Sequence, residues 1–511
     1  MARWGTFPWG NGTKWGASDV TETLAYGLEI DWNGDGSFDG SSEASYMIAW
    51  SSFRGRRNML RSTGTGFESI QTGTLTITLD NNDDRYTTRN TSSPLYPNVV
   101  PGKEIRFRVR DMSQTGTVIY PVFYGTIIDI EPQYNNVIIT AEDGWRFLRT
   151  YSAGVATQED ITPDEAAGLL LDSIGWPERW GRDLDSFSDL IPYWWASGNR
   201  KAGTELEDLL NSFLGHFFVD NAGRARVSGR ISVSSSAADL FQDQLLKDFR
   251  NPQPWENQYN VTRIKVHPRV VASSGTIYQM TGTAPSIQPG ASLTIFADYR
   301  YNNLLVPAIN VITPVATTDW LTNTQADGLG SDKTANCTLS FTDFGDTAKM
   351  KFTNNDAGTV FLIAPKIRGQ AVYESSSADV TYPTDLDTVQ QKRQFLLDLI
   401  WQQDINAAES FTQAFGDFLD RDNLFPVVSI ENRPELQYAA DLFDIVSLTI
   451  VQKGIDGLSF KVSGISHKSD PSIRTCQRVT TELLLEPYIS SSDFWIWDTA
   501  SEFDTKTIFG F

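Results

Sequence analysis

A strict alternation of apolar and hydroxyl side chains places the strongest constraint on this chain. In residues 73–79, leucine and isoleucine alternate with threonine, which is the two-residue period of a strand with one buried and one solvated face. Further strand patterns follow at 105–109, 123–130 and 137–140. Because helix signals are few between them, the stretch from 73 to 148 predicts a small antiparallel barrel or sandwich.

Five short motifs occur in this stretch in a fixed order. They are Leu79-Asp80-Asn81, Arg85-Tyr86, Pro94-Leu95-Tyr96-Pro97, Pro101-Gly102-Lys103 and Phe123-Tyr124-Gly125-Thr126-Ile127. Each motif alone is unspecific, but their order resembles the first tube-like domain of bacteriophage tail hub proteins. The resemblance implies a homotrimer whose two barrels per subunit form a pseudo-sixfold ring that continues the tail tube. Such a ring would carry receptor-binding or fibre proteins, seat the end of the tape-measure protein and open to release DNA.

The length and the order of patterns divide the chain into several units. At 511 residues it is too long for one core, since domains hold roughly 100–200 residues each. We predict a mainly β protein with α+β elements, in which a capped helix begins at Thr162. The predicted units are an aromatic N-terminal arm at 1–19, a first tube-like antiparallel β-barrel at 20–150, a small α+β domain at 151–250, a connecting α+β region at 251–270 and 379–441, an inserted β-sandwich at 271–378, a second tube-like β-barrel at 442–486 and an aromatic C-terminal arm at 487–511.

A weak internal echo links the two predicted barrels. Residues 123–131 and 460–468 each begin with an aromatic residue, contain a glycine and reach an isoleucine soon after. This similarity is consistent with a duplicated barrel.

The two arms are rich in aromatic side chains. A short segment cannot bury three tryptophans by itself, so the N-terminal arm either lies over its own domain or clasps a neighbouring subunit. The candidate interface residues are Trp4, Trp9 and Trp15 in the first arm and Phe494, Trp495, Trp497 and Phe511 in the second.

One acidic loop has the spacing of a calcium site. Asp31, Asn33, Asp35 and Asp39 follow the pattern D-x-N-x-D-G-x-x-D, in which alternate oxygen ligands wrap a hard cation. The twelfth position is Ser42, so the bidentate glutamate of an EF-hand is missing. That loss favours a hairpin turn with solvated carboxylates, and calcium, if bound, would be held weakly.

The charge balance argues against nucleic-acid binding as the main task. Acidic residues number 63 against 42 basic, a formal net charge of −21. Solubility alone explains such a balance, and a negative wall would also let DNA pass without binding it. The one basic cluster, Arg54, Arg56, Arg57 and Arg61, fits pairing with acidic neighbours or an interface better than DNA contact.

No pattern predicts an enzyme. The three histidines lack ligand spacing, and the sequence contains no phosphate-binding loop, nucleophile elbow or zinc motif. The two cysteines, far apart, fit assembly in a reducing cytoplasm. We find no apolar run of about eighteen residues and no signal-peptide core, so neither a membrane span nor classical secretion is expected.

The leading hypothesis is therefore a structural hub of a phage tail tip or a tail-derived particle, assembled in the host cytoplasm and located at the virion tail tip. Its expected partners are two further copies of itself, a tail tube or distal tail protein, the tape-measure protein, fibre or receptor-binding proteins, and DNA only in passage. We expect no cofactor other than calcium. Two alternatives stay open: a carbohydrate-binding or carbohydrate-cleaving surface protein, suggested by the tryptophans and the sandwich, and a calcium-stabilised bacterial adhesin.

Overall fold

The structure is a computed structural model in which strands greatly outnumber helices, so the mainly β prediction is confirmed. The described residues are 24–38, 42–61, 63–112, 118–229, 237–241, 246–252, 259–383, 391–420, 424–431, 433–470, 476 and 478–488. Among them, no helix is long and apolar enough to cross a membrane.

Six antiparallel strands form what we call the N-terminal module. They are β1 (Leu24–Ile30), β2 (Met47–Gly55), β3 (Gln71–Asp80), β4 (Glu104–Asp111), β5 (Val118–Pro132) and β6 (Asn136–Glu142), in the spatial order β1-β4-β5-β6-β3-β2. The Trp50 ring packs 4.7 Å from that of Phe107, and Tyr26 stacks on the same phenylalanine at 5.8 Å. Because these residues come from β2, β4 and β1, the sheet curls until its two outer strands share one core.

Six further strands form the C-terminal module. They are β12 (Ala238–Phe241), β13 (Leu246–Arg250), β29 (Val427–Glu431), β30 (Ile445–Ile450), β31 (Ile455–Ser469) and β32 (Val479–Pro487). The first three lie outside the range 442–486 expected for the second barrel. The spatial order is β12-β30-β31-β32-β29-β13. Only four residues separate β12 from β13, so the end of β12 and the start of β13 lie no more than about 19 Å apart. Because these two strands are the outer strands of the module, this sheet curls as well.

The two modules share one topology. When the strands of each are numbered one to six along the chain, both have the spatial order 1-4-5-6-3-2. Strand five is β5 in one module and β31 in the other, the pair that the sequence echo linked. One pairing differs, because β12 runs parallel to β30 whereas β1 runs antiparallel to β4. The other pairings within the modules are antiparallel in both.

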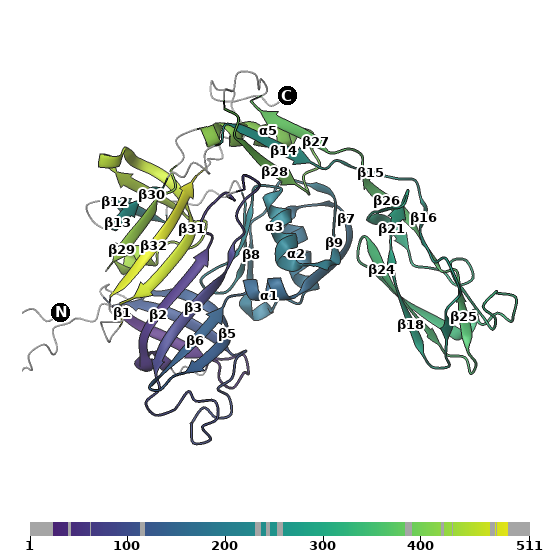
Figure 1. Cartoon of the computed structure of the whole chain (residues 1–511), viewed down its shortest axis with the longest axis horizontal. Coiled ribbons are helices and arrows are strands. Elements are labelled where there is room, and N and C mark those ends of the chain that lie inside the picture. Colours follow the sequence, from purple (N-terminus) through teal and green to yellow (C-terminus); the bar gives the residue numbers. More distant parts are fainter. Residues whose placement is uncertain are drawn as a thin grey trace, which may run out of the picture.

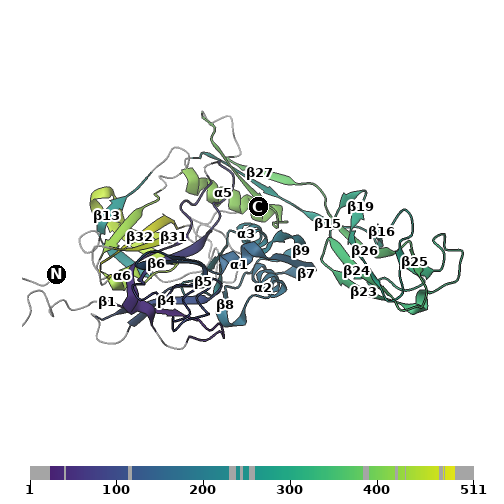
Figure 2. The same ribbon diagram turned by 60° about the horizontal axis from the view of Figure 1, so that its bottom comes forward.

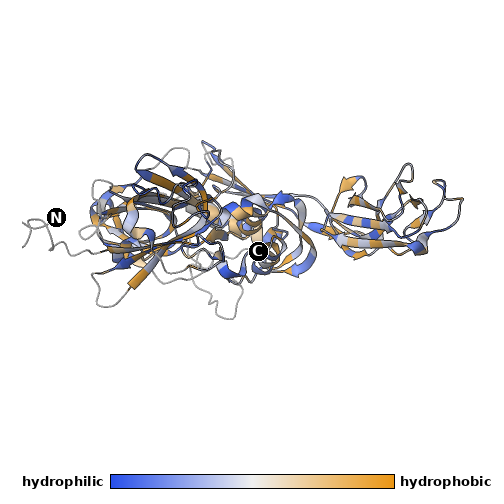
Figure 3. Cartoon of the chain, turned by 90° about the horizontal axis from the view of Figure 1, so that it is seen from below, coloured by the Kyte–Doolittle hydropathy of each residue, from blue (hydrophilic) through white to orange (hydrophobic). Residues whose placement is uncertain are grey.

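Among the described strands, one pairing joins the modules. β2 pairs with the second half of β31, so all twelve strands belong to one sheet. The modules therefore lie side by side, the first in purple and blue and the second in yellow-green (Figure 1). Along the strands, hydrophilic and hydrophobic residues alternate, as expected of sheets with one buried face (Figure 3).

An α+β unit packs against both modules. It contains α1 (Trp145–Thr150), β7 (Ser152–Ile161), α2 (Pro163–Ser173), β8 (Arg182–Leu184), β9 (Ile191–Lys201), α3 (Ala202–Asn211), β10 (His216–Val219) and β11 (Ala225–Ser228). The predicted capping box is present, with Thr162 and Glu165 exchanging hydrogen bonds. Trp176, Trp180 and Trp194 are buried in the core, so they do not form the exposed sugar-binding face that the carbohydrate alternative would use.

A smaller connecting region follows the α+β unit. The sheet β27-β14-β28 combines β14 (Val261–Val266), β27 (Ala378–Tyr382) and β28 (Gln394–Leu399). Helix α5 (Ile405–Asp420) covers it, with Phe415 stacked on Phe395 at 5.7 Å. A short helix, α6 (Pro434–Gln437), precedes β30.

Residues 269–374 form what we call the insert, which projects away from both modules (Figure 2). Its strands are β15 (Arg269–Val271), β16 (Gly275–Gln279), β17 (Ser286–Ile287), β18 (Ser292–Asp298), β19 (Arg300–Tyr301), β20 (Leu304–Leu305), β21 (Ala308–Ile312), β22 (Leu321–Asn323), β23 (Cys337–Asp343), β24 (Thr347–Asn354), β25 (Val360–Ile363) and β26 (Lys366–Glu374). They enclose a core of their own, which runs from Ala272 to Ala371.

The insert has a core of its own, and its first and last strands pair with Val271 opposite Val372. We predict that replacing residues 272–371 with an Asn-Gly hairpin turn leaves the remaining chain folded. Its thermal midpoint should stay within about 5 °C of the parent's. Near-ultraviolet circular dichroism during heating measures this, and loss of a cooperative transition would contradict it.

Candidate assembly site at the junction of the two modules

The junction begins with a ladder in which glycines face each other. Ser51–Gly55 of β2 pair with Gly464–Lys468 of β31, and Gly55 lies opposite Gly464. A Cβ on Gly55 would lie 2.2 Å from the Ser463 carbonyl oxygen, and the φ of Gly55 is +102°. A Cβ on Gly464 would lie 2.7 Å from the Arg56 carbonyl oxygen. Only glycine allows the two backbones to approach this closely.

The far end of the ladder is closed by side chains. The Ser469 hydroxyl accepts from the Trp50 N–H at 2.8 Å and donates to the Trp50 carbonyl at 3.1 Å. His467 lies 2.8 Å from the Thr481 hydroxyl, and burial lowers the pKa of His467 to about 3, so its ring is neutral. Tyr438, Cys476 and Val479 also enter the core of the N-terminal module. Residues from the C-terminal part of the chain thus complete that core.

A buried ion pair lies beside the glycines. The Arg56 guanidinium donates to both carboxylate oxygens of Glu486 at 2.8 Å, and only 2% of each side chain is exposed. Arg56 also lies over the rings of Phe67 and Phe443, at 5.8 and 5.5 Å from their centres. Lys461 is a second buried cation near Glu486, and burial lowers its pKa. Glu486 therefore neutralises two cations inside the protein.

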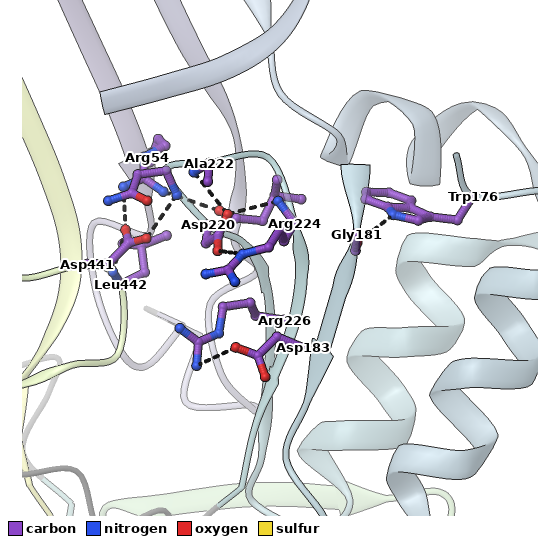
Figure 4. A network of polar contacts seen from close by, with 12 residues as sticks. Arg54, Trp176, Gly181, Asp183, Asp220, Ala222, Arg224, Arg226, Asp441 and Leu442 are labelled. Atoms are coloured by element: carbon purple, nitrogen blue, oxygen red, sulfur yellow. Dashed lines mark hydrogen bonds and ion pairs between the residues drawn. The ribbon is translucent and has the colours of Figure 1, made fainter. Parts of the chain in front are cut away.

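A second polar network ties the α+β unit to both modules (Figure 4). Arg54 of β2 forms an ion pair with Asp441 and donates to the Val219 carbonyl at 3.3 Å. Asp441 in turn accepts from the Asn221 N–H at 2.9 Å. The turn after β10 is held by Asp220, which accepts from Arg224. Three parts of the chain meet at these two charges.

A third contact fixes the α+β unit to β4. The Glu104 carboxylate accepts from Tyr124 at 2.7 Å, from Trp180 at 3.2 Å and from Arg179. Burial opposes ionisation, but the hydrogen bonds from Arg179, Tyr124 and Trp180 outweigh it and lower the pKa of Glu104. Glu104 is thus a charged anchor at this contact.

At one buried acid of the junction, hydrogen bonds and nearby cations do not outweigh the effect of burial. Asp143 accepts from the Trp145 N–H at 3.0 Å. Burial raises the pKa of the Asp143 carboxyl to about 7, although that hydrogen bond and the charge of Arg54 oppose the shift. This acid therefore titrates near neutral pH.

The acidic loop proposed for calcium is organised by its own backbone. Asp31 accepts from the N–H groups of Gly34 and Gly36 at 2.7 and 2.8 Å. Asp35 accepts from Ser37 and from the Asn33 amide. Asp39 lies outside the described residues, and within the described part of the chain no group of three or more His, Cys, Asp or Glu could hold a metal. The hydrogen bonds fit the turn interpretation, and calcium binding stays a prediction.

The aromatic arm residues proposed for interfaces all lie outside the described residues: Trp4, Trp9, Trp15, Phe494, Trp495, Trp497 and Phe511. The structure instead brings together Arg54 and Arg56, which the sequence placed in a basic cluster, with acids that sequence reasoning did not single out. Asp441 and Glu486 lie 387 and 430 residues further along the chain. The only local signal for Glu486 is a charge directly after the apolar alternation of β32.

We predict that Glu486→Gln destabilises the protein by about 3–5 kcal/mol, because it leaves Arg56 and Lys461 buried without their carboxylate. A triple variant, Arg56→Met and Lys461→Met with Glu486→Leu, removes all three buried charges and should recover most of the loss. Urea unfolding midpoints measure both. As a matched control, Asp379→Asn breaks the exposed pair with Arg263 and should cost less than about 1 kcal/mol. Equal effects of the two single variants would contradict the prediction.

We also predict a pH dependence from Asp143. Its folded pKa of about 7 exceeds that of an unfolded aspartate, near 3.9, so folding favours the protonated form. The stability that it contributes is therefore lost as pH rises from about 4 to about 7. The stability of Asp143→Asn relative to that of the parent should therefore be greater at pH 7 than at pH 4. A stability difference between variant and parent that stays constant across this range would contradict the assignment.

Comparison with known proteins gives similarity only at the level of structure. No protein-family model matches the chain, and no curated protein sequence matches it. Among solved structures, it is similar to the prophage MuSo2 43 kDa tail protein from Shewanella oneidensis, with a TM-score of 0.48, 10% identity and coverage of 91% of this chain and 99% of that one. It is also similar to a tail protein from Neisseria meningitidis MC58, with a TM-score of 0.46, 10% identity and coverage of 90% and 96%. A third is the prophage tail protein gp18 from Listeria monocytogenes EGD-e, with a TM-score of 0.42, 8% identity and coverage of 91% and 95%. All three are named as tail proteins.

Proposed function

We propose that this chain is a ring-forming structural subunit of a phage tail tip or of a tail-derived particle. The observation that carries the proposal is the repeated strand order, 1-4-5-6-3-2, in two modules that lie side by side in one sheet. A chain with two similar modules offers two similar positions around an axis. Three copies then offer six positions, which is the number needed to meet a sixfold tail tube.

The joint inside one chain suggests the joint between chains. Within the chain, strand two of the first module, β2, pairs with the second half of strand five of the other, β31. The equivalent joint places β13, strand two of the C-terminal module, against the second half of β5 in the next copy. β13 ends the described strand order on its side, and β4 pairs with β5 only up to Thr126.

The second half of β5 has the properties of an unpaired sheet edge. In its second half, Asp129, Glu131 and Pro132 are exposed. Charged residues and proline on an edge strand prevent uncontrolled pairing before assembly. Closing a ring of three copies would cover each such edge.

The proposed role is structural rather than catalytic. A ring of six modules around a channel would continue the tube, bind a tail tube or distal tail protein on one face and seat the tape-measure protein. The net charge of −21 suits a channel that DNA only passes through. The insert projects away from both modules, so it leaves the proposed joints free and offers a place for fibre or receptor-binding proteins.

We predict that Asp248→Pro in β13 reduces the fraction of three-copy assemblies while each chain stays folded. A proline on this edge strand blocks close approach of the next copy. The loss of one or two backbone hydrogen bonds, about 1 kcal/mol each, weakens association by roughly tenfold. Mass photometry at matched concentrations measures the copy number, and circular dichroism confirms the fold.

A matched control is Thr338→Pro in β23, an exposed position on the outer strand of a sheet in the insert. It should leave the copy number unchanged. Six copies in the parent assembly, or equal weakening by both proline variants, would contradict the proposed ring.

A further inference from the structure

The insert touches the rest of the chain at two places. At its neck, the chain leaves β14 for β15 and returns from β26 to β27. Near β9, the loop Asp343–Asp346 between β23 and β24, which we call the tip loop, reaches back to the α+β unit. The Thr157 hydroxyl of β7 donates to the Gly345 carbonyl at 3.3 Å. A Cβ on Gly345 would lie 2.7 Å from the Cβ of Trp195, so the two surfaces are in close contact.

The neck is held by a histidine between two acids. His267 Nδ1 lies 2.9 Å from a Glu374 carboxylate oxygen, and Nε2 lies 2.6 Å from one of Asp398. A neutral imidazole has a single N–H and can donate to only one of them, whereas an imidazolium donates to both. Glu374 belongs to the insert and Asp398 to the connecting region. The charged ring therefore clasps the two parts together.

Two cations lie near this clasp. Lys265 acts on Asp398, and Arg269 acts on Glu374. Arg269 lies between the rings of Trp195 and Trp401, at 4.8 and 4.7 Å from their centres. It also donates to the Ile400 carbonyl at 2.8 Å. Burial lowers the pKa of Arg269 to about 10, so Arg269 keeps its charge near neutral pH. His267 is the group between the two acids that gains a proton on acidification.

The contact of the tip loop gathers carboxyl groups from both sides. The insert contributes Asp298, Asp343 and Asp346, and α3 contributes Glu205 and Asp208. Arg200 is the cation that faces them, 3.4 Å from Glu205 and paired with Asp208. Tyr299 donates to Asp343 at 3.0 Å. One carboxylate oxygen of Asp346 is buried and has no hydrogen-bond partner among the described residues.

We propose that protonation controls the docking of the insert, which is held against the α+β unit at acidic pH and released as pH rises. At both the neck and the tip loop, a rise in pH should weaken the contact. Burial raises the pKa of Glu205 to about 7 and that of Asp346 to about 6, so both acids lose their protons as pH rises through this range. Above those values they ionise beside each other and repel.

The histidine and the acids should change docking in the same direction as pH rises. Hydrogen bonding to Asp398 and Glu374 raises the pKa of His267 above its usual range. Its contribution to docking is therefore complete below the usual histidine value and is lost as pH rises through the raised one. Docking should weaken progressively from about pH 5 to about pH 8. The inference concerns the chain itself and does not depend on the proposed ring.

The test is single-molecule energy transfer in the full chain. Dyes are placed at Leu329→Cys in the insert and Tyr134→Cys in the turn between β5 and β6, whose native side chains are 83% and 96% exposed. The native Cys337 and Cys476 are buried. Sparse labelled chains are mixed with an excess of unlabelled ones. We expect a narrow distribution of transfer efficiency at about pH 5 and a distribution roughly twice as wide at about pH 8.5.

Three variants decide the cause. Glu205→Gln with Asp346→Asn keeps the contact neutral at all pH values, so the widening should fall by more than half. In His267→Gln the amide oxygen replaces one of the two donating ring nitrogens and can only accept, so the variant should widen the distribution already at the lower pH. Asp356→Asn, which alters an acid paired with Lys333 elsewhere in the insert, should behave like the parent. A parent distribution that does not change with pH, or the same widening in the neutral double variant, would overturn the proposal.

Discussion

The short backbone ladder between β2 and β31 is the interaction on which the rest of the structure depends. It joins segments more than four hundred residues apart and converts two six-stranded modules into one sheet. The ladder requires a close approach of backbones at Gly55 and Gly464. Directly beyond it lies the Arg56–Glu486 pair. Because burying two charges costs solvation energy, we interpret this pair as a device that fixes the register of the joint more than one that adds stability.

The elements that could be predicted from sequence are those whose pattern is local. The alternation around Leu75 produced β3 with Leu75, Ile77 and Leu79 buried, and the hydroxyl and acid at Thr162 and Glu165 produced the capped start of α2. The echo between residues 123–131 and 460–468 linked strands that occupy the same place in the two modules. These signals depend on side chains a few residues apart, so no tertiary information is needed to recognise them.

What the sequence did not predict depends on distant partners. The strands β12 and β13 are four and five residues long, too short for a period of two to be distinguished from a loop. They complete the C-terminal module only because β30 and β29, roughly two hundred residues later, pair with them. The partners of Arg54 and Arg56 were invisible for the same reason. A charged residue in a sequence shows that it needs a counter-charge but not where in the chain that charge lies.

The differences between the two modules show which parts of the repeated topology are constrained. The large departures lie away from strands two and five. Strand one reverses direction between β1 and β12, and the long segment between β13 and β29, including the insert, replaces the short connection from β2 to β3. Strands two and five, which form the joint seen at β2 and β31, keep their neighbours within each module. A duplicated module that must join copies of itself can vary in direction and connection at strand one, and can accept whole domains in its loops. In the ring that we propose, it cannot vary at the strands that meet the next module, because every joint around the ring would have to change with them.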